Sequence, residues 1–325
     1  MIKSKFVKPS SYITLIVVLF LIPLFIPSPY YLSIFIMCGI NVILATSLRV
    51  VYNCGELSIA HGGMMLLGAY TSGLLVLKLG VSTWLALVMG GVAATTLALI
   101  VGFPLFRLRG IYFAIVTAFL SEVISLTAKQ WSNVTGGTMG LTGIPKPDPI
   151  VIPRLLEIGF TSTADMYYLI LVLVLITILI LYAIEHSRIF TTWISIRESN
   201  DLAASVGVNL SNYKVLAFCV CCFFPGITGA FYSQYMGIIE PTSFGFTYSI
   251  YVIVYFVVGG VDNFIGPIIG ALILTLIPEF ARGLKQFEPY VFAGAMILIV
   301  HFMPQGIAGI PQLLVKIFKE RRGHA

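Results

Sequence analysis

The feature that most constrains this sequence is a series of apolar runs, each close to 20 residues long, along most of its 325 residues. A membrane-spanning helix needs about 20 consecutive apolar residues, because the hydrocarbon core of a bilayer is roughly 30 Å thick. The runs do not alternate polar and apolar residues, as the strands of a membrane β-barrel would. Charged residues make up only 10% of the chain, its mean hydropathy is +1.00, and a soluble domain carries about 25% charge. The sequence therefore predicts an all-α integral membrane protein, a polytopic helical bundle of about 8–10 transmembrane helices.

The apolar runs mark ten candidate spans in one transmembrane domain, residues 1–325. They are predicted at about 11–27, 31–52, 57–78, 83–104, 111–130, 166–185, 213–235, 247–260, 264–281 and 289–305. Three polar segments interrupt or follow them: a loop at 131–165, a second loop at 186–214 and a basic tail at 306–325.

The distribution of basic residues predicts the orientation, because cytoplasmic loops carry an excess of Lys and Arg. With the N-terminus in the cytoplasm, 13 of the 19 basic residues fall on the inner side and 6 on the outer side. Both termini and the 186–214 loop are then cytoplasmic, and 131–165 is external. The net charge of +6 therefore reflects basic residues on the cytoplasmic side rather than nucleic-acid binding, and the basic tail is expected to lie against anionic lipid. Arg282 and Lys285 fall on the outer side only if 264–281 spans fully.

The cytoplasmic loop 186–214 predicts a short helix with a small apolar face. Residues 199–201 can cap its start, and Gly207 is a natural stop. Leu202, Ala203 and Val206 fall on one face, where alanine lets a second surface approach closely. Charged residues able to pair across a boundary surround it: Arg188, Arg197, Glu198 and Asp201. A displayed apolar helix face is typical of a plug for a groove on a soluble partner, and an ordinary solvated loop is the alternative.

Three polar residues within or beside the apolar runs are candidate functional residues. Asn41 needs a partner, either in a helix–helix hydrogen bond or in a ligand. Glu122 lies near the middle of its span, where a carboxylate is a functional-site hypothesis by default; it binds an ammonium group, pairs with Asn41 or His61, or is kept protonated. His61 has no second His, Cys or carboxylate cluster nearby in sequence, so we expect packing or pathway lining rather than a metal. No catalytic or metal site is predicted.

Five separated motifs resemble those of the branched-chain amino acid type of ABC importer permeases, and together they cover roughly residues 31–310. One is the order acidic–x–Ala–x3–Gly at 201–207, which resembles the coupling loop of such permeases, with Asp201 in place of the usual Glu and Leu202 in place of the first Ala. The others are GELSIAHGGMMLLGAY (55–70), RLRGIYFAIVT (107–117), TGGTMGLTGIP (135–145) and GGVDNFIGPIIGA (259–271). The likeness is to the longer of the two permeases of such an importer.

The resemblance implies a permease subunit of an ATP-driven importer for hydrophobic, branched-chain amino acids, a transport protein and not an enzyme, in the plasma (inner) membrane of a prokaryote. The sequence has no G-x4-G-K-[ST] motif, so no cofactor is expected on this chain and two separate ATPase subunits would use ATP and magnesium. The resemblance also implies a second homologous permease and an extracytoplasmic substrate-binding protein. The ATPases would dock on 186–214 through these residues: Arg197, Glu198, Asp201, Leu202, Ala203 and Gly207.

A substrate pathway is expected along polar and glycine residues elsewhere in the chain. The candidates are Asn41, Ser58, His61, Glu122, Gly136, Gly137, Thr142 and Gln234. The external segment 131–165 suits docking of the substrate-delivery protein or closure of the pathway, and a rigid turn is the alternative. Permeases for urea and short amides resemble the same pattern. An ion-coupled secondary transporter would work through an intramembrane carboxylate, for which Glu122 is the clear candidate.

Overall fold

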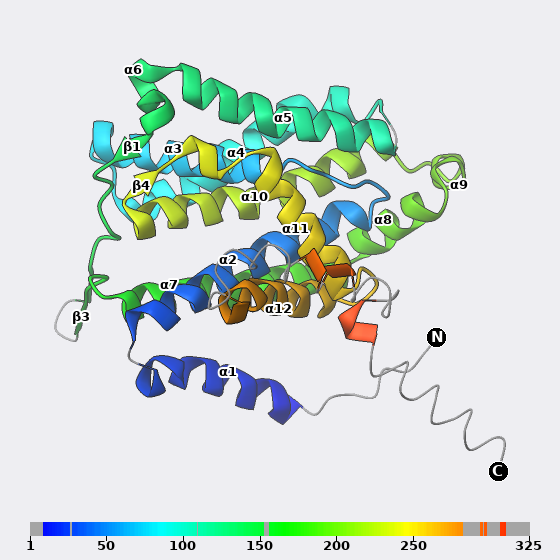
Figure 1. Cartoon of the computed structure of the whole chain (residues 1–325). Helices are drawn as coiled ribbons and strands as arrows, with labels where there is room; N and C mark the ends of the chain where they lie inside the picture. The colour runs from blue at the N-terminus through cyan, green and yellow to red at the C-terminus, as the bar shows by residue number, and fades with distance from the viewer. Residues whose placement is uncertain are drawn as a thin grey trace, which may run out of the picture.

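A computed structural model of the chain describes residues 9–26, 28–108, 110–152, 156–281, 293–294, 296–297 and 306–309. Long apolar helices lie side by side in one bundle (Figure 1). They are α1 (Pro9–Phe25), α2 (Pro29–Tyr52), α3 (His61–Leu79), α4 (Thr83–Leu105), α5 (Ile111–Gln130), α7 (Thr163–Glu185), α10 (Leu210–Met236), α11 (Phe246–Gly259) and α12 (Gly266–Ala281). Within the described ranges, seven helices are long and apolar enough to cross a membrane, counting the 3-10 turn η2 (Pro241–Ser243) with α11, and α12 contributes a shorter apolar helix. The predicted all-α polytopic membrane fold is confirmed.

The helices begin and end within about three residues of the predicted spans, apart from the start of the third span. The predicted helix start at residue 57 is wrong, because residues 56–60 follow a non-helical path and α3 begins at His61. The predicted span 289–305 lies outside the described residues except for 293–294 and 296–297, which are helical. Of the predicted tail, the structure describes 306–309, which hold the 3-10 turn η4 (Ile307–Gly309).

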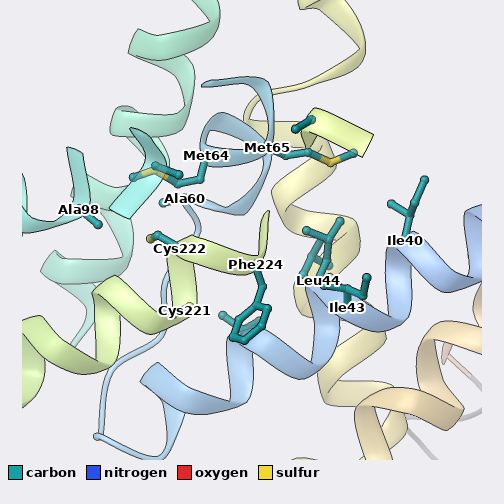
Figure 2. Close-up of a cluster of buried hydrophobic side chains, with 14 of the residues drawn as sticks. Ile40, Ile43, Leu44, Ala60, Met64, Met65, Ala98, Cys221, Cys222 and Phe224 are labelled. Carbon is teal, nitrogen blue, oxygen red and sulfur yellow. The ribbon is translucent and has the colours of Figure 1, made fainter. Parts of the chain in front are cut away.

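The core of the bundle forms where α10 packs against α2, α3 and α4. Figure 2 shows buried side chains from these four helices, among them Leu44, Met64, Ala98 and Phe224. Helices surrounded by lipid gain little from hydrophobic burial, so close van der Waals contact between small residues holds them together. A Cβ atom placed on Gly68 of α3 would lie 2.0 Å from the carbonyl oxygen of Gly226 on α10. The backbones of α3 and α10 therefore touch at these two glycines.

Short elements gather at the two ends of the bundle. At the left of Figure 1 lie α6 (Ser132–Thr135), η1 (Gly137–Met139), the strand pair β1 (Leu141–Thr142) with β4 (Ile238–Ile239), and the strand pair β2 (Ile150–Ile152) with β3 (Leu156–Ile158). Both pairs are antiparallel. At the right lie α8 (Arg188–Glu198) and α9 (Asn200–Ser205). We call these the strand end and the α8–α9 end.

Candidate functional site

The helix predicted in the 186–214 loop is α9, and its two limits are as expected from the sequence. The hydroxyl of Ser199 accepts a hydrogen bond from the backbone N–H of Leu202 at 3.3 Å, which caps the start of α9. Gly207 ends the helix with φ +86°, and its N–H bonds the carbonyl of Ala204 at 3.0 Å. A side chain with a Cβ rarely adopts this backbone conformation, so glycine is the residue that the stop requires.

The exposed surface of α9 differs from the predicted face in one residue. Leu202 and Val206 are 71% and 79% exposed, as expected for a displayed apolar face. The prediction that Ala203 shares this face is wrong: it is only 3% exposed, because α9 packs onto α8 and α10 with Ala203 as its buried residue. We call the exposed residues Glu198, Asp201, Leu202, Val206 and Gly207 the α9 surface.

Sequence reasoning missed α8, which precedes α9 and positions it. Trp193 and Ile196 are each 1% exposed, and the indole N–H of Trp193 donates to the carbonyl of Tyr213 at 2.9 Å. Ser187 caps the helix by accepting from the N–H of Phe190. The signal was present in the sequence, because a capping serine followed by apolar residues at 190, 193 and 196 repeats the spacing of one helix face.

Arg197, expected to face a partner, contacts this chain. Its guanidinium carbon lies 4.5 Å from the ring centroid of Tyr52. Its two terminal nitrogens donate to the amide oxygen of Asn53 and the hydroxyl of Tyr52, each at 3.3 Å. Arginine stacks on aromatic rings in this way. Arg197 therefore fastens α8 to the end of α2, and a contact with a partner stays a prediction.

A buried ion pair at the α8–α9 end links three segments that sequence reasoning treated separately. Lys214 Nζ of α10 lies 2.7 Å from Glu56 Oε1, with the two side chains 5% and 2% exposed. The other carboxylate oxygen of Glu56 accepts the backbone N–H of Gly110, immediately before α5, at 3.1 Å. A buried charge is tolerated when it is paired and its remaining hydrogen-bonding positions are used, and both oxygens of Glu56 have partners.

Hydroxyl groups from other helices hold the start of α3 at His61. The first N–H groups of a helix lack partners within it. The N–H of Gly62 donates to Ser249 Oγ of α11, and that of Gly63 to Ser121 Oγ of α5, both at 2.8 Å. Thr117 of α5 likewise accepts the N–H of Ile59 at 3.0 Å. These bonds explain why the chain is non-helical before His61.

Four of the predicted pathway residues are packed inside the bundle. Asn41 donates to Thr275 Oγ1 at 2.9 Å and accepts from the Tyr248 hydroxyl at 3.0 Å, so the helix–helix alternative is confirmed. The amide nitrogen of Gln234 likewise ties α10 to the hydroxyl of Ser72 and the carbonyl of Thr83.

The other two, His61 and Ser58, lie together at the start of α3. His61 Nε2 lies 3.3 Å from Ser47 Oγ and 3.6 Å from Cys221 Sγ, and His61 is 2% exposed. Ser58, 1% exposed, accepts the N–H of Ala60. Among the described residues, no three His, Cys, Asp or Glu side chains lie close enough together to hold a metal ion.

Glu122 lies partly exposed on α5, close to Gly245, the residue before α11. Its Oε2 would be 3.3 Å from a Cβ placed on Gly245. The predicted pairing with Asn41 or His61 is wrong, because both residues bond other partners. The N-terminal end of α11 favours a negative charge nearby. Binding of an ammonium group by Glu122 stays a prediction.

The remaining pathway candidates, Gly136, Gly137 and Thr142, belong to the strand end. A Cβ on Gly136 would lie 2.1 Å from the carbonyl oxygen of Gly140, and one on Gly140 would lie 1.8 Å from that of Ile239. Thr142 pairs with Ile238 in the β1–β4 sheet. These contacts support the rigid-turn interpretation of this segment. The pathway candidates are thus divided among the bundle interior, the partly exposed Glu122 on α5 and the strand end, and they do not form one site.

The strand end is also fastened to α4 through Asp148. Its carboxylate accepts the N–H of Thr83 at 2.9 Å, and its own N–H donates to Thr83 Oγ1 at 2.7 Å. The hydrogen bond from the Thr83 backbone lowers the pKa of Asp148 below its ordinary value, although the side chain is exposed.

A bundle of membrane-crossing helices with a capped helix pair at one end defines a multi-pass membrane protein. Comparison with known families then identifies it more closely. The profile of the family described as "Branched-chain amino acid transport system / permease component" matches residues 30–301. The chain belongs to this family of ABC transporter permeases.

Curated relatives agree with the family assignment. The chain is 28% identical over 303 residues to the high-affinity branched-chain amino acid transport system permease protein LivM of Escherichia coli K12, covering 86% of this chain and 68% of LivM. It is 28% identical to LivM of Salmonella typhimurium, covering 86% and 71%. It is 23% identical to the permease LivH of Escherichia coli K12, covering 80% and 87%. No solved structure matches the chain.

Proposed function

We propose that this chain is the membrane-spanning subunit of an ATP-driven importer for branched-chain amino acids, and that separate ATPase subunits bind the α9 surface. The observation that carries the proposal is the exposed apolar pair of Leu202, on the short helix α9, and Val206, directly after it. Binding of a partner would bury these two apolar side chains and remove them from water. Glu198 and Asp201 beside them are exposed and suit basic residues of that partner.

The positions of the basic residues support the orientation that we propose for the protein in the membrane. Arg188, Arg197 and Lys214 lie at the α8–α9 end, and basic residues concentrate on the cytoplasmic side. The α8–α9 end would then meet cytoplasmic ATPases, and the strand end would face outward. We place the protein in the inner membrane of a prokaryote.

The transport cycle needs a bundle with two states that bind the ATPases differently. When ATP closes the two ATPases, they pull on α8 and α9, and the bundle switches between outward-facing and inward-facing states. Glu122 on α5, partly exposed and near the centre of its span, is the residue that we assign to the ammonium group of the amino acid.

The further partners follow from the relatives. LivM and LivH are both named as permeases of a high-affinity branched-chain amino acid transport system, and the chain resembles both. We propose that a second, related permease completes the membrane part of the importer. A substrate-binding protein would dock at the strand end, where the backbone-held turn at Gly140 offers a rigid surface.

The experiment that tests the proposal is purification of the full chain from its native membrane in mild detergent, followed by identification of bound ATPases. We expect ATPase subunits with the wild-type chain and at least about tenfold less with the double variant Leu202→Glu, Val206→Glu. The matched control is Leu79→Glu, since Leu79 is 70% exposed at the opposite end of α3. Absence of any ATPase with the wild-type chain would contradict the proposal, as would undiminished binding by the double variant.

A further inference from the structure

We propose that the buried ion pair of Glu56 and Lys214 transmits movement of the α8–α9 end to α5. This inference rests on the proposed function, because it names the contact through which a docked ATPase acts on the bundle. Both residues are ordinary in the sequence. Glu56 lies in a loop between two spans, and Lys214 is one of the basic residues of the 186–214 loop. Only the fold brings them together.

Two of the recognisable motifs and the end of the 186–214 loop meet at Glu56. One carboxylate oxygen pairs with Lys214 at 2.7 Å, and the other accepts the N–H of Gly110 at 3.1 Å. Glu56 belongs to the motif at 55–70, Gly110 to the motif at 107–117, and Lys214 to the end of the 186–214 loop. A single buried side chain thus joins the segment before α3, the start of α5 and the first turns of α10.

The α8 helix contacts both sides of the Glu56–Lys214 pair, close to Glu56 and close to Lys214. Arg197 stacks on Tyr52 and bonds Asn53, three to four residues before Glu56. Trp193 bonds the carbonyl of Tyr213, the residue before Lys214. The backbone also approaches closely, because a Cβ on Gly55 would lie 3.2 Å from the Cα atom of Arg197. A displacement of α8 therefore moves both partners of the ion pair.

On the other side, the junction continues into α5. Gly110 is the N-cap of α5, with φ +58°. From there α5 reaches the start of α3 through Thr117 and Ser121, and η2 through a bond from Ser125 to the carbonyl of Pro241. A shift of Gly110 is thus passed to the helix that carries Glu122 and to the helices that bond its hydroxyl groups.

The Glu56–Lys214 ion pair is not needed for the stability of the fold if an apolar pair of similar volume can replace it. Replacing a buried ion pair with apolar residues of similar volume is often neutral for stability, whereas removing one partner leaves a costly unpaired charge. What the charges add is a directional link between atoms on separate elements. The double substitution Glu56→Leu, Lys214→Met can therefore remove the link while keeping the packing.

A second ion pair at the same end provides a matched control. Arg49 Nη2 of α2 lies 2.8 Å from Glu185 Oε1 of α7, with side-chain exposures of 8% and 19%. The other bonds of Arg49 run to the carbonyls of Val261 and Asp262. The pair has the same chemistry and a similar position but joins elements other than α5.

The experiment measures amino acid uptake and ATP hydrolysis together, in vesicles containing the importer complex purified through this chain. Radiolabelled leucine is the probe. For Glu56→Leu, Lys214→Met we expect ATP hydrolysis within about twofold of the wild-type rate and leucine moved per ATP reduced at least about tenfold. Glu56→Gln, which keeps the side-chain size, is expected to lower the ratio by about threefold. For Glu185→Gln the ratio is expected to stay unchanged.

The outcomes separate this inference from the proposed function. If the wild-type complex shows no ATP-dependent uptake, the proposed function fails and the inference fails with it. If the wild-type complex couples normally and the double variant keeps its ratio, the ion-pair inference alone is overturned. An equal drop for Glu185→Gln also overturns it, because any loosening of this end would then uncouple transport. If the double variant does not assemble, the ratio for Glu56→Gln decides.

Discussion

The two ends of the bundle are held together in different ways. At the strand end, backbone meets backbone, as where Gly140 lies against the carbonyl of Ile239, and Asp148 adds local bonds to Thr83. At the α8–α9 end, side chains from distant segments form a few bonds, chiefly Glu56–Lys214 and Arg197 on Tyr52. Backbone packing tolerates no displacement, whereas a few directional side-chain bonds allow an element to move as a unit. The strand end is therefore a fixed surface, and the α8–α9 end is the part that we propose to move.

The largest effect is expected at the strand end for Gly140→Val, where the backbone packing is among the tightest in the described residues. The new Cβ would meet the Ile239 carbonyl at 1.8 Å in a backbone with φ +74°. We expect a loss of about 4 kcal/mol or more in the free energy of unfolding, measured by thermal unfolding in detergent. The control is Gly143→Ala, at φ +79° with open space around it, which should cost only the strain of about 1–2 kcal/mol. Equal losses at the two glycines would contradict tight packing as the cause.

The next effect tests the charges of the α8–α9 end. Glu56→Leu alone leaves Lys214 buried without a partner, and we expect a loss of about 3–5 kcal/mol in stability. Adding Lys214→Met should restore most of it, because the apolar pair fills the same space. Thermal unfolding of both variants measures the difference. If the double variant is no more stable than the single one, Glu56 and Lys214 do not form the pair that the structure places there.

A smaller effect is expected where α8 meets α2. Arg197→Lys keeps the charge but loses the planar stacking on Tyr52 and one of the two hydrogen bonds. We expect a loss of about 1 kcal/mol, because the contact is partly exposed. Arg188→Lys, on an exposed residue of the same helix, serves as the control and should change stability by less than about 0.5 kcal/mol. Identical melting curves for the two variants would show that Arg197 does not fasten α8.

The smallest effect concerns pH at the strand end. The pKa of Asp148 is lowered in the folded protein by the hydrogen bond from Thr83. A lowered folded pKa means that this stabilisation is present above the ordinary carboxylate pKa of about 3.9 and is lost as the pH falls below it. Between about pH 5 and about pH 3, a range that brackets the ordinary carboxylate pKa, we expect the melting temperature of Asp148→Asn to fall less steeply than that of the wild type. Parallel curves would contradict the assignment.

Local signals predicted much of the fold. Apolar length predicted the helices, and the capping serine and the final glycine predicted both limits of α9. Two features could not be predicted from the sequence, because they depend on contacts between distant segments. The start of α3 is moved to His61 by hydroxyl groups on α5 and α11, which no local pattern records. Ala203 was assigned to the displayed face because an isolated helix does not reveal which side its neighbours cover.

The candidate site was predicted less completely than the fold. Leu202 and Val206 are exposed, as their spacing indicated, and the charged residues Glu198 and Asp201 are exposed beside them. The polar residues within the apolar runs, however, turned out to have mostly structural partners, as for Asn41 with Thr275 and Tyr248. The Glu56–Lys214 pair was missed because the two residues are 158 positions apart in sequence.

The most direct test of the account is leucine uptake by vesicles containing the complex purified through this chain. Uptake is measured under three conditions. In the first, ATP is present in the compartment that the α8–α9 end faces; in the second, a non-hydrolysable ATP analogue replaces it; in the third, an ion gradient is applied without ATP. The account predicts uptake that requires hydrolysable ATP and is lost in the double variant Leu202→Glu, Val206→Glu. Uptake that follows the ion gradient without ATP and is abolished by Glu122→Gln would contradict it and identify an ion-coupled transporter instead.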